Sequence, residues 1–98
     1  MVTLQDAKEE LVGFGLVVEG HERRIDGALS KDGIFFKGPS FSVDQKNDQW
    51  RVILGSHLAK WGRIIYFAEL VDAVAFLKRV YSELPDRISH GWKPNLAR

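Results

Sequence analysis

A single apolar stripe between residues 70 and 84 constrains the fold more than any other feature of the sequence. Its residues recur at the spacing of one helix face, at Leu70, Val74, Leu77, Tyr81 and Leu84, with Ala73 and Val80 filling the same stripe. The charged residues of the segment lie largely off the stripe, and Pro85 marks its end. An amphipathic helix must bury its apolar face, so we predict that this helix packs on another layer of the fold.

The middle of the chain supplies that layer, because short β-favouring runs alternate there with glycine-containing turns. The clearest hairpin joins two runs of alternating apolar and polar residues, 41–43 and 50–54, through the polar loop 44–48. One strand is predicted before it at residues 16–18, and a last strand after it at residues 63–67. These segments predict an antiparallel meander.

A further strand is predicted at residues 34–36, between two turn signals. The turn Lys31-Asp32-Gly33 favours a hairpin before it, and Gly38-Pro39 ends it, since proline gives up a ladder donor. Residues 56–62 are predicted as a loop that holds Trp61. The sheet then has about four to five short strands, which is a common size.

The chain begins with another helix, predicted over residues 4–12. Thr3 supplies its N-cap, Asp6 lies in its first turn where the helix dipole favours negative charge, and Gly13 marks its stop. We therefore predict an α+β fold, a two-layer sandwich with the N-terminal and C-terminal helices packed on one face of the antiparallel sheet. Residues 1–85 form this single domain, and residues 86–98 form a tail.

The composition indicates a soluble protein without a metal or redox centre. The 98 residues include 14 Lys and Arg, 13 Asp and Glu and no cysteine, and the longest apolar run is only a few residues. His21, His57 and His90 are too far apart in sequence to place two metal ligands on one helix face. We expect a cytoplasmic protein with no cofactor, no metal and no membrane partner.

The motifs of common enzyme classes are missing from the sequence. It has no Gly-x-x-x-x-Gly-Lys-Ser/Thr loop and no Gly-x-Ser-x-Gly elbow, and Gly13-Phe14-Gly15 lacks the third glycine of a dinucleotide loop. The loop 44–48 is acidic, but Lys46 stands where a calcium site needs an oxygen ligand. A carboxylate pair assembled in space stays open. We expect no catalytic residues and a protein that is not an enzyme.

Two tryptophans carry the first functional hypothesis. Trp61 lies in the predicted loop beside Lys60 and Arg63, and Trp92 lies in the predicted tail beside Lys93. Tryptophan and arginine are the residues most enriched at the hot spots of protein interfaces. Alternatively, both tryptophans fold back as lids over the sheet edge.

The uncovered face of the sheet completes this hypothesis. Apolar residues such as Ile53 and Ile65 would make it a docking surface if they are exposed there. We predict a non-catalytic protein-binding module of the inhibitor, immunity or adaptor type, which docks on another protein or on itself as a homodimer. Its predicted partner-binding residues are Trp61, Trp92, Arg63, Lys60, Ile53 and Ile65.

The alternative is a nucleic-acid-binding protein, and a family resemblance supports it. The order Trp50-Arg51-Val52, a loop, a strand ending at Phe67, then Glu69, Ala73 and Phe76-Leu77 resembles the small DNA-binding modules of the AP2 and integrase arm-binding type. This resemblance implies a sheet that reads DNA through Arg51, Ile53 and Arg63, and Ile53 departs from the basic pattern. The same closing helix also looks like that of small immunity and inhibitor proteins.

The basic residues of this alternative are Arg51, Lys60, Arg63 and Lys93. The net charge of +1 gives a weaker signal than nucleic-acid binders usually show. The order of helix, strands and helix is also similar to that of a double-stranded RNA-binding domain. That family places lysines at the start of its second helix, where this chain has Glu69 and Asp72.

Overall fold

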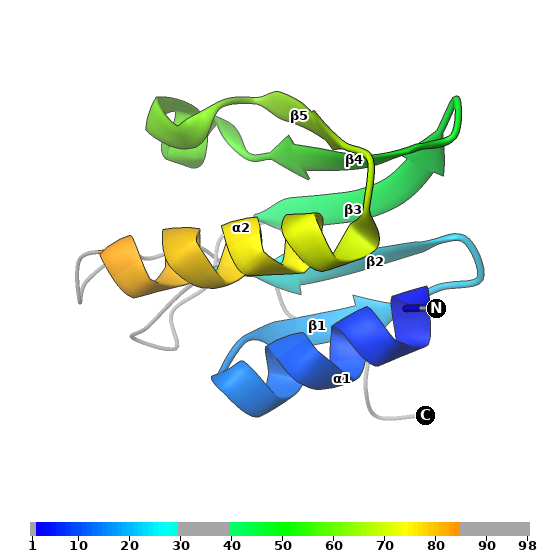
Figure 1. Cartoon of the computed structure of the whole chain (residues 1–98). Coiled ribbons are helices and arrows are strands. Elements are labelled where there is room, and N and C mark those ends of the chain that lie inside the picture. The colour runs from blue at the N-terminus through cyan, green and yellow to red at the C-terminus, as the bar shows by residue number, and fades with distance from the viewer. Residues whose placement is uncertain (1, 30–39, 85–98) are drawn as a thin grey trace.

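The computed structural model describes residues 2–29 and 40–84, which form two α-helices and a five-stranded sheet. In chain order the elements are α1 (Leu4–Phe14), β1 (Val17–Gly20), β2 (Arg24–Ala28), β3 (Phe41–Lys46), β4 (Gln49–Leu54), the 3-10 helix η1 (Ser56–Trp61), β5 (Ile64–Phe67) and α2 (Leu70–Glu83). Each strand pairs antiparallel with the next, so the sheet is a meander in the order β1-β2-β3-β4-β5. Both helices lie on one face of the sheet (Figure 1), which confirms the predicted α+β fold.

Thr3 and Asp6 start α1 as the sequence predicts. The Thr3 hydroxyl accepts a hydrogen bond from the Asp6 amide at 3.1 Å, and the Asp6 carboxylate accepts one from the Thr3 amide at 3.0 Å. Each bond satisfies an amide that has no partner within the helix. The predicted range 4–12 is too short, because Gly15, with a φ of 119°, and not Gly13 adopts the left-handed conformation that ends the helix.

The hairpin of β3 and β4 turns in two residues. Asn47 and Asp48 have positive φ angles of 52° and 64°, which is the backbone of the turn that best matches the twist of paired strands. The predicted loop 44–48 is therefore wrong in extent, because residues 44–46 continue β3 and pair with residues 49–51 of β4. A longer loop would leave the ladder hydrogen bonds of these residues unmade.

The strand β2 is missed by the sequence analysis. It mixes charged residues and glycine with a single β-branched residue, Ile25, so its β-propensity is low. Pairing with β3 places this strand in the sheet. Ile25 lies opposite Val43, and Gly27 lies opposite Phe41, on the face that the helices cover. The predicted strand 34–36 and its two turns lie outside the described residues.

The chain between β4 and α2 is more regular than predicted. Residues 56–62, predicted as a loop, contain η1, which ends before Gly62 with its φ of 114°. The predicted last strand, 63–67, is confirmed as β5 from Ile64 to Phe67, and Arg63 precedes it. Pro85 and the predicted tail 86–98 lie outside the described residues.

The core lies between the two helices and the sheet. Its buried side chains include Ala7 and Leu11 of α1, Val18, Ile25, Phe41, Val43, Val52 and Leu54 of the sheet, and Leu70, Ala73, Val74, Leu77 and Val80 of α2. The predicted apolar stripe of α2 is thus confirmed, with Tyr81 half-buried at its end. No helix in the described part of the chain is long and apolar enough to span a membrane.

The two helices run in the same direction and contact each other through their C-terminal halves (Figure 1). The Tyr81 hydroxyl donates to the Gly15 carbonyl at 3.4 Å, and its ring packs edge-on against Phe14 with centroids 6.0 Å apart. Lys78 forms an ion pair with Glu10 across the same seam. These contacts join the N-terminal helix directly to the C-terminal helix.

Gly27 allows the closest packing in the sheet. A Cβ atom added there would lie 2.2 Å from the ring Cζ of Phe41 and 2.9 Å from the carbonyl oxygen of Val17. Phe41 is the cross-strand neighbour of Gly27 and is fully buried. The glycine therefore provides the space that this ring occupies in the core.

We expect Gly27→Ala to lower the free energy of unfolding by about 1–3 kcal/mol, because the methyl group overpacks a site bounded by a ring and a backbone carbonyl. The matched control is Gly13→Ala in α1, where an added Cβ atom meets nothing within 4 Å. Alanine favours the helix there and should add up to about 1 kcal/mol. Urea unfolding followed by circular dichroism compares the two variants. Equal stabilities would contradict the close packing at Gly27.

Candidate functional site

The face of the sheet opposite α1 and α2 is covered by no described helix or strand (Figure 1). The strand register draws two rows of side chains across it. One row runs through Glu19, Asp26, Ser42, Ile53 and Ile64, and the other through Arg24, Asp44, Arg51 and Tyr66. These two rows are therefore polar over β1 to β3 and become apolar over β4 and β5, with the apolar pair of Val17 and Ala28 at one end of β1 and β2.

Ile53, Ile64 and Tyr66, bordered by Arg51, form the apolar end of the open face, which we call the β4–β5 patch. Ile64 is 55% exposed and Tyr66 is 46% exposed, while Ile53 is half-buried. Ile53 lies opposite Ile64 in the register, and Arg51 lies opposite Tyr66. Side chains opposite each other on one face of a sheet are in contact range, so the four form one surface.

Arg51 is held in place at the border of this patch by Asp44. Its Nε and Nη2 atoms donate to the two carboxylate oxygens of Asp44 at 2.8 Å and 2.5 Å. These hydrogen bonds, with a smaller contribution from Tyr66, raise the pKa of Arg51 above its usual value. The carboxylate of Asp44 therefore balances the positive charge of Arg51, so Arg51 would attract a phosphate group more weakly than a free arginine.

Trp61 and Lys60 lie at the end of η1, and Trp61 folds back on α2. The Trp61 indole donates to Oε1 of Glu83 at 3.2 Å, and Nζ of Lys60 lies 4.5 Å from the centroid of the indole ring. Trp61 is half-buried against the core, so it folds back toward the domain, and a lid over the sheet edge stays a prediction. Nε of Arg63 donates to the Leu54 carbonyl at 3.2 Å.

Ile65 lies on the helix-covered face and not beside Ile53 on the open face. It pairs with Val52 and is half-buried against the core, and its neighbour Ile64 takes the open position instead. Adjacent residues of a strand point to opposite faces, so the run Ile64-Ile65 cannot reveal from sequence which of the two faces outward. The other predicted residues, Trp92 and Lys93, lie outside the described residues.

The polar end of the open face holds a cluster that the sequence analysis misses. Nε2 of His21 lies 3.0 Å from a carboxylate oxygen of Glu19 and 3.2 Å from Oδ2 of Asp26. Asp26 is only 7% exposed and accepts hydrogen bonds from Nε of Arg24 at 3.1 Å and from the Ser42 hydroxyl at 2.7 Å. The cluster thus links three strands through one buried carboxylate.

An imidazole and two carboxylates are ligand types that a cation can use, and the donor atoms of Glu19, His21 and Asp26 lie within 4.8 Å of one another. Arg24 already supplies a positive charge to Asp26, so the cluster is an ion-pair network. Glu19 lies on β1 and His21 lies just after its end, so the sequence does show these two residues two positions apart. Asp26 could join them only through β2, which the sequence did not predict.

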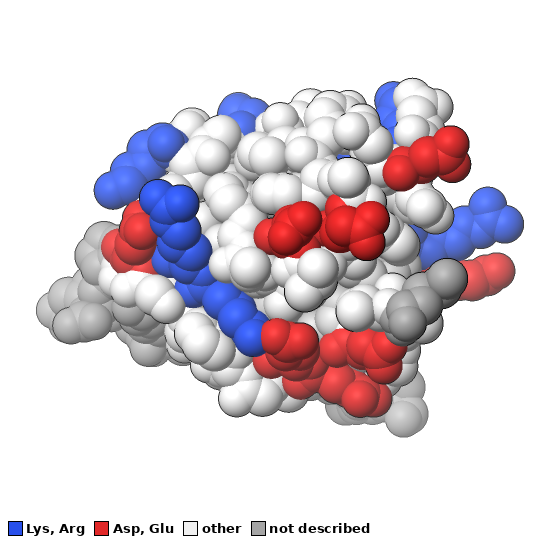
Figure 2. Space-filling view, viewed as in Figure 1, with Lys and Arg blue, Asp and Glu red and all other residues white. Residues whose placement is uncertain are grey.

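The helix face of the molecule carries both signs of charge. Figure 2 shows acidic side chains over α1 and the first turns of α2, and basic side chains toward the C-terminal end of α2. Two of these basic residues are paired, Lys78 with Glu10 and Arg79 with Glu83, the latter at 3.1 Å. The carboxylates that pair with these two residues reduce the positive charge that this end of α2 offers to a polyanion.

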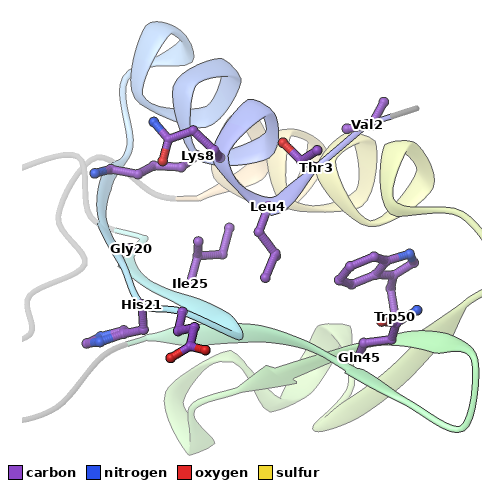
Figure 3. Close-up of a pocket in the computed structure, with 11 residues that line it drawn as sticks. Val2, Thr3, Leu4, Lys8, Gly20, His21, Ile25, Gln45 and Trp50 are labelled. Atoms are coloured by element: carbon purple, nitrogen blue, oxygen red, sulfur yellow. The ribbon is translucent and has the colours of Figure 1, made fainter.

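A groove of about 630 Å³ opens between the first turn of α1 and the ends of the two hairpins (Figure 3). Leu4 and Trp50 point into it, Ile25 lines it, and Lys8 and Gln45 lie on its rim. Its volume is in the range of small-molecule sites. Leu4 and Trp50 also pack against the core, so their apolar surface is already partly used.

Comparisons with known proteins found no relative of the chain. No protein-family model matches it, and neither a curated protein nor a solved structure does. Its function is therefore inferred from its own surface.

The bond between Trp61 and Glu83 predicts a specific acid sensitivity. The Trp61 indole and the Arg79 guanidinium both donate to the Glu83 carboxylate and hold its pKa below the usual value of 4.5. A carboxyl group with a lowered pKa adds stability above pH 4.5, and this contribution is lost as the pH falls through the lowered value. Glu83→Gln keeps an acceptor oxygen but lacks this titration.

We therefore expect the wild type to lose more stability than Glu83→Gln when the pH is lowered from above 4.5 to well below it. Urea unfolding at a series of pH values measures the difference. Two parallel curves would show that the carboxylate of Glu83 contributes nothing to the folded state.

Proposed function

We propose that this chain is a non-catalytic protein-binding module of the cytoplasm, of the inhibitor, immunity or adaptor type, whose partner docks on the β4–β5 patch. One observation carries the proposal. Both helices lie on the same face of the sheet, and the opposite face exposes 55% of Ile64 and 46% of Tyr66. Exposed apolar side chains that adjoin one another are typical of a docking surface.

The composition of the patch also supports a protein partner. Tyrosine and arginine are among the residues that dominate binding energy at protein interfaces, and the register sets Tyr66 opposite Arg51. Asp44 fixes the guanidinium of Arg51 before any partner arrives. A preorganised side chain loses less conformational entropy when it is covered.

The proposed docking surface is centred on the β4–β5 patch and not on Trp61, which the sequence had suggested. Its indole already donates to Glu83 and packs against the core, so a partner would find little of it to cover. The nucleic-acid alternative has less support, because Arg51 is paired with Asp44 and Lys60 lies over the ring of Trp61.

Ile53→Lys tests the proposal, because it places a charge inside the patch without changing β5. The tagged full chain captures partners from a nuclease-treated lysate of the source cell. The wild type should capture a protein partner in stoichiometric amount. We expect Ile53→Lys to capture about one tenth of that amount or less, as for an interface hot spot. The matched control is Val71→Lys on α2, which changes a residue that is 52% exposed outside the patch and should capture as the wild type does.

Circular dichroism must first show that both variants fold as the wild type does. Equal capture by the wild type and Ile53→Lys would then rule out docking on the β4–β5 patch. Capture that occurs only without nuclease would favour the nucleic-acid alternative through Arg51, Lys60 and Arg63.

A further inference from the structure

β5 is an edge strand, since it pairs with β4 on one side and with no described strand on the other. The Leu54 amide donates to the Arg63 carbonyl at 2.8 Å, which makes these residues a hydrogen-bonded pair. Hydrogen-bonded and non-hydrogen-bonded pairs alternate along an antiparallel ladder, so Ile65 also directs its backbone groups to β4. The N–H and C=O groups of Ile64 and Tyr66 therefore point away from the sheet.

This edge lacks the features that usually keep edge strands from pairing. The four residues of β5, Ile64–Phe67, include no charged residue, no proline and no glycine. The strand at the other edge of the sheet, β1, contains both Glu19 and Gly20. Charges and strand-weakening residues are the common protection of an exposed edge. The contrast indicates that β5 is the edge suited to pairing.

A second copy of the chain offers a matching strand. When two β5 strands pair antiparallel about a twofold axis at Ile65, Ile64 of each copy lies opposite Tyr66 of the other. The outward N–H and C=O groups of both residues are then satisfied in both copies. Each pair also joins a β-branched side chain to an aromatic one, which is a favourable cross-strand combination.

The charges that flank β5 favour the same arrangement. Arg63 precedes the strand and Glu69 follows it, and both are exposed. Antiparallel pairing brings the basic end of one strand near the acidic end of the other, whereas parallel pairing would bring like charges together.

We propose that the protein forms a twofold symmetric dimer in which two β5 strands pair antiparallel through Ile64 and Tyr66. The two five-stranded sheets then join into one sheet of ten strands, and the two β4–β5 patches become neighbours across the axis. The dimer contact is the backbone edge of β5 and is separate from docking on the face of the patch. A heterologous partner on that face is compatible with the dimer and does not replace it.

Sedimentation equilibrium of the pure full chain tests the dimer. The mass should rise with concentration from 11.1 kDa toward twice that value. Tyr66→Pro removes an outward donor but none of the donors to β4, and we expect self-association at least about tenfold weaker, as two hydrogen bonds per dimer are lost. Val71→Lys is the matched control, because it changes the exposed face of α2 and leaves both the patch and the β5 edge intact.

A cysteine variant tests the register even if Tyr66→Pro fails to fold. The chain has no cysteine, so Ile65→Cys introduces a single thiol. The two Ile65 positions form a non-hydrogen-bonded pair in the proposed dimer, with Cα atoms about 4.5 Å apart, which a disulfide can span. We expect a covalent dimer under mild oxidation, and no covalent dimer from Val71→Cys on the exposed face of α2.

Each remaining outcome overturns the proposal. A wild type that stays monomeric at every concentration excludes self-pairing, while the patch is still tested by capture with Ile53→Lys. A dimer that survives in Tyr66→Pro and is lost in Ile53→Lys would be formed face to face and not through the edge. Equal cross-linking of Ile65→Cys and Val71→Cys would show random collision.

Discussion

Burial of the apolar stripe of α2 against one face of the sheet is the interaction on which the rest of the structure depends. Leu77 and its neighbours on the stripe pack on the same layer as Phe41 and Val52, and α1 extends this cover over β1 and β2. Because side chains alternate along a strand, every residue buried under the helices leaves a neighbour on the opposite face. The open face, with its polar and apolar ends, is a direct result of this one-sided packing.

The parts of the fold that the sequence predicted are those with a local signal. Helical periodicity defines α2, the pair of Thr3 and Asp6 defines the start of α1, and alternation defines the hairpin of β3 and β4. β2 carries no such signal, because it mixes charged residues with Gly27, whose missing side chain leaves space for the ring of Phe41 from the neighbouring strand. The role of such a residue depends on a contact with another strand, so it becomes visible only when the position of that strand is known.

The candidate site was only partly predictable for the same reason. The sequence names Ile53 and Ile65 as candidates for the open face, but the choice between Ile64 and Ile65 depends on the register with β4. The bond from Trp61 to Glu83 spans 22 residues of sequence, so no local pattern could indicate it. The cluster around Asp26 likewise needs three strands in place, since Ser42 reaches it from β3.

The seam between the helices has a consequence for how the chain folds. The strands of the meander pair with their neighbours in sequence, so their contacts close short loops and cost little chain entropy. The bond from Tyr81 to Gly15 instead closes a loop of 66 residues, and the pairing of Lys78 with Glu10 one of 68. We therefore expect the hairpins to form the folding nucleus. The contact between α1 and α2 should form later, and it then joins the N-terminal end of the domain to its C-terminal end.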